Sequence, residues 1–269
     1  VKGLAGGGGG DSDQVVCLTA SLWGLGQLCQ PPLLKVEGKV DDQMKLNAPQ
    51  GMCGYLSSVD VTEYIFGHAV TVNEDWWRIA LAESGFGNGV LTPVIRRRDL
   101  FAMADEALTS PHGALMLLWN TLAWGTGTGA RNNSRRIRAI AADREGCSAA
   151  LMRAAQLARI DPSAAYEALR PSRNRNLIAY LGPAFFTKYL YVAGGGNADH
   201  RCVILDMRVA SALRPAGWST MPLTGWWTET YMRYIELLEN WRDEIGVDRL
   251  DLLERWLFEQ GRPPRARRR

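Results

Sequence analysis

The sequence predicts a mainly helical protein, with a helical bundle in its second half and an irregular N-terminal region before it. Apolar residues make up 46% of the 269 positions, which is enough to bury one large core. After Asn73, one segment of helical period follows another. Residues 114–124 are apolar on nearly every side, as expected for a helix at the centre of a domain.

Changes of composition divide the chain into three parts. Residues 1–72 have no sustained period and are predicted to be irregular, with a few strands. The first eleven of them include the run from Gly6 to Gly10 and are expected to be flexible. Residues 73–261 are predicted to form the helical domain, and residues 262–269 a basic tail.

Helices are predicted wherever apolar residues recur at helical spacing between capping residues and Gly or Pro. Asp161 before Pro162, and Asp206 before residues 207–213, are typical helix starts. The other predicted helices are 74–83, 99–108, 114–124, 134–143, 147–160, 174–181, 187–193, 228–244 and 248–259. Only the turn at 182–186 separates 174–181 from 187–193, which is the pattern of a helix–hairpin–helix.

Composition excludes several classes of protein. The longest apolar stretch spans eleven residues, whereas a membrane-spanning helix needs roughly 20, and the N-terminus does not read as a leader. We therefore expect a cytoplasmic protein. The cysteines lack disulfide and metal spacing, so we expect reduced thiols and no metal cluster. We expect no cofactor. They are Cys17, Cys29, Cys53, Cys147 and Cys202.

The net charge of +3 does not by itself indicate a nucleic-acid partner. Five arginines lie in the last eight residues, so the rest of the chain carries a net charge of −2. Local groups of arginine could nevertheless lie on one face and bind nucleic acid, or they could simply be solvated helix surfaces. These are Arg96, Arg97, Arg98, Arg131, Arg135, Arg136, Arg138, Arg173 and Arg175.

Lys188 is the first candidate for chemistry. Its sequence neighbours are mostly aromatic, and an amine in apolar surroundings loses hydration, which favours its neutral, nucleophilic form. Most lysines on an apolar helix instead extend their ammonium group into water. Asp206 follows eighteen residues later at a helix start, where a carboxylate stays ionised. The two groups could therefore meet in one cleft.

Two segments resemble the helix–hairpin–helix DNA glycosylases, and among them the 8-oxoguanine DNA glycosylases and their bacterial look-alikes. They are LGPAFFTK, which ends at Lys188, and VILDMRV, which contains Asp206. The resemblance extends over about residues 114–261. It implies a glycosylase-type helical bundle, with Lys188 as the catalytic lysine and Asp206 as its acidic partner.

The hairpin departs from the family pattern, which usually reads Leu-Pro-Gly-Val-Gly. In those enzymes, backbone N–H groups of the hairpin hold a DNA phosphate, and the resemblance extends this DNA contact to Gly182 and Thr187. Pro183 removes one donor and the second glycine is absent. We therefore expect a weaker or differently arranged grip on DNA.

The base is expected to bind near the C-terminal helix. Phe258 resembles the aromatic residue that stacks on the extruded base in guanine-specific relatives, and Glu254 stands where they place a glutamine. Ionised, Glu254 accepts from two adjacent N–H donors, which suits a guanine-like edge. Val192, one turn beyond Lys188, and Trp227 are further candidates for this pocket. The alternative is that these aromatic residues are core and Glu254 a surface charge.

Two sets of polar residues are harder to assign. One loop resembles the polar loop that fills the gap left by a flipped base in relatives, although an Asn pair is also common in turns. It contains Asn132, Asn133 and Arg135. The histidines have no partner at a catalytic spacing, so we expect ordinary hydrogen-bonded side chains. They are His68, His112 and His200.

The leading hypothesis is a bifunctional DNA glycosylase and β-lyase that removes an oxidised or modified purine, such as 8-oxoguanine, through a Schiff base on Lys188. Its expected partner is double-stranded DNA with a flipped base. A first alternative is a repurposed relative in an anti-phage gene island, acting on a modified base or nucleotide with partners encoded there. A second is a non-catalytic module that binds nucleic acid through its arginines.

Overall fold

The computed structural model describes residues 46–87, 89–90 and 92–261. The predicted flexible start, the basic tail, Cys17 and Cys29 lie outside these residues. The described residues belong to one compact unit, which begins at Met44. No helix among them is long and apolar enough to cross a bilayer.

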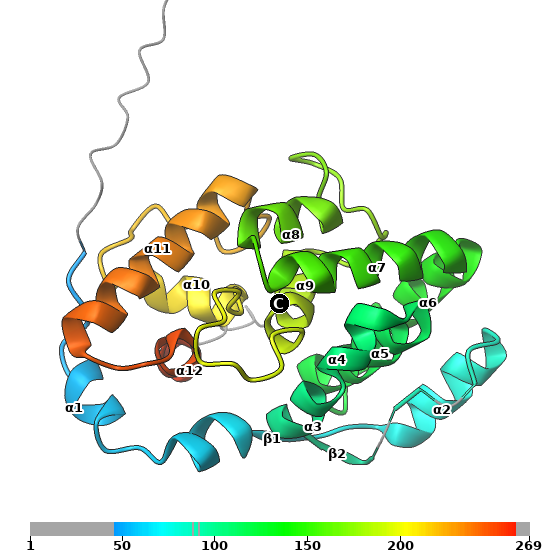
Figure 1. Cartoon of the computed structure of the whole chain (residues 1–269), viewed down its shortest axis with the longest axis horizontal. Helices are drawn as coiled ribbons and strands as arrows, with labels where there is room; N and C mark the ends of the chain where they lie inside the picture. Colours follow the sequence, from blue (N-terminus) through cyan, green and yellow to red (C-terminus); the bar gives the residue numbers. More distant parts are fainter. Residues whose placement is uncertain (1–45, 88, 91, 262–269) are drawn as a thin grey trace, which may run out of the picture. The chain divides into compact units, whose positions relative to one another are not determined.

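The fold is mainly helical, as predicted (Figure 1). Its two short strands, β1 (Ala69–Thr71) and β2 (Val94–Arg96), pair antiparallel with Val70 opposite Ile95. The helices are α1 (Met52–Leu56), the π-helix η1 (Thr62–Phe66), α2 (Glu74–Glu83), α3 (Arg97–Ala102), α4 (Ala104–Thr109), α5 (Pro111–Thr126), α6 (Asn133–Ala142), α7 (Arg144–Ala158), α8 (Pro162–Leu169), α9 (Pro183–Val192), α10 (Met207–Leu213), α11 (Thr228–Ile245) and α12 (Leu250–Gln260).

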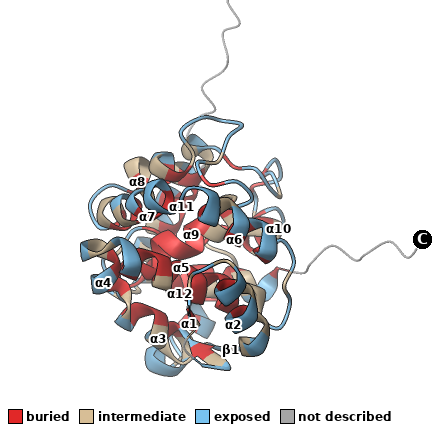
Figure 2. Cartoon of the chain, turned by 90° about the vertical axis from the view of Figure 1, so that its right-hand side faces the viewer, coloured by how far each residue is buried: buried red, intermediate tan, exposed pale blue. Residues whose placement is uncertain are grey.

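Helices α5 and α9 form the centre of the core. In Figure 1, α9 lies between the helices α4 to α7 and the helices α10 to α12. Figure 2 shows α9 buried along most of its length. The cause is composition, since the sequence PAFFTKYLYV offers apolar surface on every side of the helix. A lysine in this helix is therefore carried into the interior.

The N-terminal part of the described chain is more ordered than predicted. Residues 46–72 contain α1, η1 and β1, and the first two pack against α12. Two tyrosines attach this segment, since the hydroxyls of Tyr55 and Tyr64 donate to Glu259 on α12. Within 46–72, β1 is the only strand. The segment is thus a layer beside the C-terminal helix.

One predicted helix is wrong. Residues 174–181 form a loop, and α9 begins at Pro183 rather than near Thr187. Two local contacts favour turns over helix here. The side chain of Arg170 donates to Asn176 at 2.7 Å, and the backbones of Ser172 and Arg175 form an isolated β-bridge. Proline at the first helical position fixes the start of α9. The predicted helix 99–108 is two helices in the structure, α3 and α4.

Both predicted helix starts are confirmed. Asp161 accepts from the backbone N–H groups of Ser163 and Ala164 at the start of α8. Asp206 does the same for Arg208 and Val209 at the start of α10. The three cysteines within the described residues are free thiols.

Candidate active site

Lys188 and Asp206 form an ion pair in the protein interior. Lys188 Nζ lies 2.7 Å from Asp206 Oδ2 and 3.1 Å from the carbonyl oxygen of Ala184. The exposed fractions of the two side chains are 8% and 13%. The amine therefore points away from bulk solvent, toward a carboxylate that can take up its proton.

The two carboxylate oxygens of Asp206 have different partners. Oδ1 accepts from the backbone N–H groups of Arg208 and Val209 and so starts α10, which leaves Oδ2 for Lys188. Burial disfavours the carboxylate, but the neighbouring Lys188 and the two backbone donors outweigh it, and together they lower the pKa of Asp206. The aspartate is ionised at neutral pH.

The segment before Asp206 is held from two helices. The hydroxyl oxygen of Thr187 on α9 accepts a hydrogen bond from the backbone N–H of Leu205 at 3.2 Å. From α11, the hydroxyl of Tyr231 donates to Val203 at 2.9 Å, and that of Tyr234 donates to Ile204 at 3.0 Å. These bonds fix the carboxylate relative to Lys188 although the segment is neither helix nor strand.

The ion pair lies at the wall of a cavity of about 90 Å³. Gly125 of α5 makes room for the lysine, because a Cβ atom there would lie 3.1 Å from Lys188 Cδ. The cavity brings together residues from both ends of the described chain. They are His68, Val70, Arg97, Trp124, Gly125, Lys188, Ile204, Asp206, Glu254 and Phe258.

Glu254 forms a buried ion pair with Arg97 in the same cavity wall. Arg97 Nη2 lies 2.9 Å from Glu254 Oε2, and each side chain is 1% exposed. Burial raises the pKa of Glu254, although Arg97 opposes this shift. Because Arg97 occupies Oε2, Glu254 offers one oxygen to a ligand rather than the two predicted. Oε1 has no hydrogen-bond partner among the described residues.

Arg97 is held by further buried polar groups. Its Nη1 donates to the hydroxyl of Tyr191, which donates to Asp251. Asp251 in turn pairs with Arg249 at 2.8 Å. This chain of charge-assisted hydrogen bonds fixes Arg97, and through it Glu254, at one position.

Phe258 lines the cavity from α12. The guanidinium carbon of Arg208 lies 4.0 Å from the centre of its ring, which is a close cation–π contact. Arg208 is held there by a hydrogen bond from its Nε to the carbonyl oxygen of Gly261. The ring is therefore fixed in orientation at the same cavity as the lysine.

Other predicted site residues lie apart from the cavity. Val192 is fully buried and does not line it. Trp227 is 43% exposed at the start of α11, with the guanidinium of Arg173 above its ring. Thr187 is fully buried and holds Leu205, so its side chain does not face a surface where DNA would bind.

The predicted DNA contacts differ in exposure. Asn132 is exposed in the left-handed conformation before α6, and Arg135 is exposed with its guanidinium near the ring of Tyr180. Asn133 is fully buried, where it accepts from Arg136 and donates to Thr126. Gly182 precedes the first residue of α9. Two of the arginines considered for a basic face, Arg97 and Arg136, are buried.

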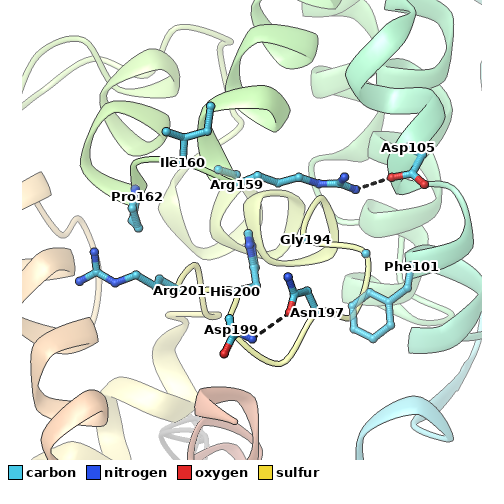
Figure 3. A pocket seen from close by; sticks show the side chains of 12 residues that line it. Phe101, Asp105, Arg159, Ile160, Pro162, Gly194, Asn197, Asp199, His200 and Arg201 are labelled. Atoms are coloured by element: carbon cyan, nitrogen blue, oxygen red, sulfur yellow. Dashed lines mark hydrogen bonds and ion pairs between the residues drawn. The ribbon is translucent and has the colours of Figure 1, made fainter. Parts of the chain in front are cut away.

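A second cavity, of about 360 Å³, lies beside the loop that follows α9 (Figure 3). Its two arginines already have acidic partners: Arg159 pairs with Asp105, and Arg201 with Glu239, both at 2.6 Å. The imidazole of His200 in its wall is bound to the carbonyl oxygen of Leu190. We assign no ligand to this cavity.

The mainly helical fold, with an enclosed amine and carboxylate at one cavity, is consistent with a glycosylase-type fold. The chain matches the family described as "Putative 8-oxoguanine DNA glycosylase OGG-like protein" over residues 63–258, and it belongs to this family. The match extends from just before His68 to Phe258 and so covers the whole cavity. Comparisons with curated proteins and with solved structures found no match. Family membership indicates a DNA glycosylase-type function with DNA as substrate.

Sequence reasoning does not identify six of the residues that line the cavity, which are His68, Val70, Arg97, Trp124, Gly125 and Ile204. The sequence predicts an ordinary hydrogen-bonded histidine at position 68, a group of surface arginines that includes Arg97, and a helix over 114–124 that ends before Gly125. Gly125 in fact lies inside α5, which runs to Thr126. Arg97 and Glu254 are 157 positions apart, so no local pattern indicates that they pair.

Proposed function

We propose that the chain is a bifunctional DNA glycosylase and β-lyase that removes an oxidised or modified purine, such as 8-oxoguanine, from duplex DNA. One observation carries the proposal: Lys188 Nζ lies 2.7 Å from Asp206 Oδ2, in the wall of a cavity. A nucleophilic amine beside a carboxylate that accepts its proton is the arrangement that covalent catalysis by lysine needs.

The reaction begins with a proton transfer from the Lys188 ammonium group to Asp206 Oδ2. The neutral Nζ then attacks C1′ of the deoxyribose, the C1′–N bond breaks, and the base leaves with the bonding electrons and the proton held by Asp206. Opening of the sugar ring yields a protonated Schiff base between Nζ and C1′. Loss of a proton from C2′ to the regenerated carboxylate then expels the 3′ phosphate.

The base must leave the duplex to reach Lys188, since its glycosidic bond is inaccessible within the helix. Phe258 would stack on the extruded base, while Glu254 Oε1 would accept from its edge. Outside the cavity, the exposed Asn132 and Arg135 would contact the DNA. The cavity of about 90 Å³ is small, so we expect side chains to move as a purine enters.

Base release from an 8-oxoguanine duplex tests the proposal. The native chain should release the base and nick the strand, and borohydride should trap a covalent protein–DNA adduct. Lys188→Gln should lose all three activities, while Arg153→Gln, a change at an exposed position of α7, should keep the trapping. No base release by the native chain, or undiminished trapping by Lys188→Gln, would refute the assignment.

The altered hairpin favours a second function. Pro183 at the first position of α9 has no N–H group to offer a phosphate, and residues 174–181 do not form the helix that would precede the hairpin. A weaker grip on duplex DNA suits a relative used in anti-phage defence, which acts on a modified phage base or on a free nucleotide. Activity on a panel of modified bases and nucleotides, with unmodified duplex as control, distinguishes the two functions.

A further inference from the structure

Three cavity residues carry buried polar atoms without a partner. Among the described residues, six buried side-chain nitrogen or oxygen atoms lack a hydrogen-bond partner. Three of the six are His68 Nδ1, Arg97 Nε and Glu254 Oε1, and all three residues line the cavity that contains Lys188. Buried polar groups in native proteins are nearly always paired, so such a cluster calls for an explanation.

His68 is held rigidly within this cluster. Its carbonyl oxygen accepts from the backbone N–H of Arg97 at 3.1 Å and from the indole of Trp124 at 3.4 Å. Its ring meets the ring of Trp124 edge to face, with the centroids 5.1 Å apart, and lies 6.3 Å from the ring of Phe258. The imidazole thus has a fixed orientation between two aromatic side chains of the cavity wall.

The charge state of His68 is also fixed. Burial, reinforced by three nearby arginines, lowers the pKa of His68 to about 2, so the ring is neutral at any pH of interest. A neutral imidazole presents one donor and one acceptor nitrogen. The arginines are Arg97, Arg255 and Arg208.

We propose that His68 determines which base the cavity accepts, by forming a hydrogen bond through Nδ1 while Glu254 Oε1 accepts from the same base. This deepens the proposed function and rests on it. The ligand is then a nucleobase whose edge carries an N–H donor for Glu254 and a hydrogen-bonding group placed for His68. His68 lies directly before β1, after the segment whose helices α1 and η1 pack on α12. Base recognition would therefore combine residues from two distant parts of the chain.

The test separates base recognition from sugar chemistry. His68→Phe keeps an aromatic ring between Trp124 and Phe258 but removes both nitrogens, and His68→Gln is the second variant. Release of 8-oxoguanine from duplex should fall roughly tenfold or more in kcat/KM for His68→Phe. Borohydride trapping on an abasic duplex, which has no base to recognise, should stay within about twofold of native. His112→Phe, a change at an exposed histidine, should match native in both assays.

Binding of free 8-oxoguanine, measured by equilibrium dialysis, gives a readout that needs no catalysis. The native chain and His112→Phe should bind it equally, and His68→Phe and His68→Gln roughly tenfold or more weakly. Equal binding by all four proteins, or equal losses of base release and abasic trapping in both His68 variants, would overturn the inference. If no protein traps abasic DNA but binding still depends on His68, the lyase chemistry fails while the role of His68 stands.

Discussion

The partial burial of the His68 ring predicts how the stability of the protein depends on pH. In the unfolded chain a histidine has a pKa of about 6.5, whereas the pKa of His68 in the folded protein is about 2. Between these values the unfolded state binds a proton that the folded state does not. Stability therefore falls as the pH falls below 6.5.

The size of the effect follows from the two pKa values. Each pH unit within the window corresponds to about 1.4 kcal/mol, and the loss builds up gradually around pH 6.5. Between pH 7 and pH 5, His68 alone should cost about 2 kcal/mol of unfolding free energy. Any folded-state pKa below about 4 gives the same figure, so the prediction does not depend on the depth of the shift.

Urea unfolding of the native chain and of His68→Phe, followed by circular dichroism at pH 7 and pH 5, measures this cost. The native chain should lose about 2 kcal/mol more than the variant over that range, because phenylalanine cannot take up the proton. Other titrating groups, including the half-buried His200, contribute equally to both proteins and cancel. Equal losses of unfolding free energy in the two proteins would show that His68 is not neutral in the folded state.

Three further substitutions test the site. Glu254→Ala should cost about 3 to 5 kcal/mol in urea unfolding, because Arg97 is left buried without its partner; a cost below about 1 kcal/mol would contradict the buried pair. Asp206→Asn should lower the rate of single-turnover base release at least about 100-fold. The helix content measured by circular dichroism should stay the same, since Asn starts a helix as well as Asp. An unchanged rate would remove Asp206 from the mechanism. Gly125→Ala should displace the Lys188 side chain and reduce borohydride trapping at least about tenfold; native-level trapping would show that the close approach is unimportant.

Local signals in the sequence predicted much of the fold. The helix starts at Asp161 and Asp206 depend on a side chain and the next three residues, and both are as predicted. The helix predicted at 174–181 failed because contacts such as that from Arg170 to Asn176 favour a loop over the weak helical pattern. A hydrogen bond between two side chains six positions apart leaves no periodic trace in a single sequence.

The candidate site was predictable only where it resembles a known pattern. Lys188 and Asp206 could be singled out because a hairpin and a capping aspartate place them on neighbouring elements. Arg97 and His68 could not, since the first stands between two exposed arginines and the second in a segment without period. The burial of Arg97 can be recognised only from the structure, in which its distant partner Glu254 lies beside it.

The most direct test of the account is to find which atom binds the sugar. The native chain is incubated with an 8-oxoguanine duplex, reduced with borohydride and digested, and the modified peptide is sequenced by mass spectrometry. The sugar remnant should be on Nζ of Lys188. After cleavage on the C-terminal side of arginine, Lys188 lies in the peptide that begins directly after Arg175. A remnant on any other amine, or base release with no adduct at all, would contradict the covalent role of Lys188.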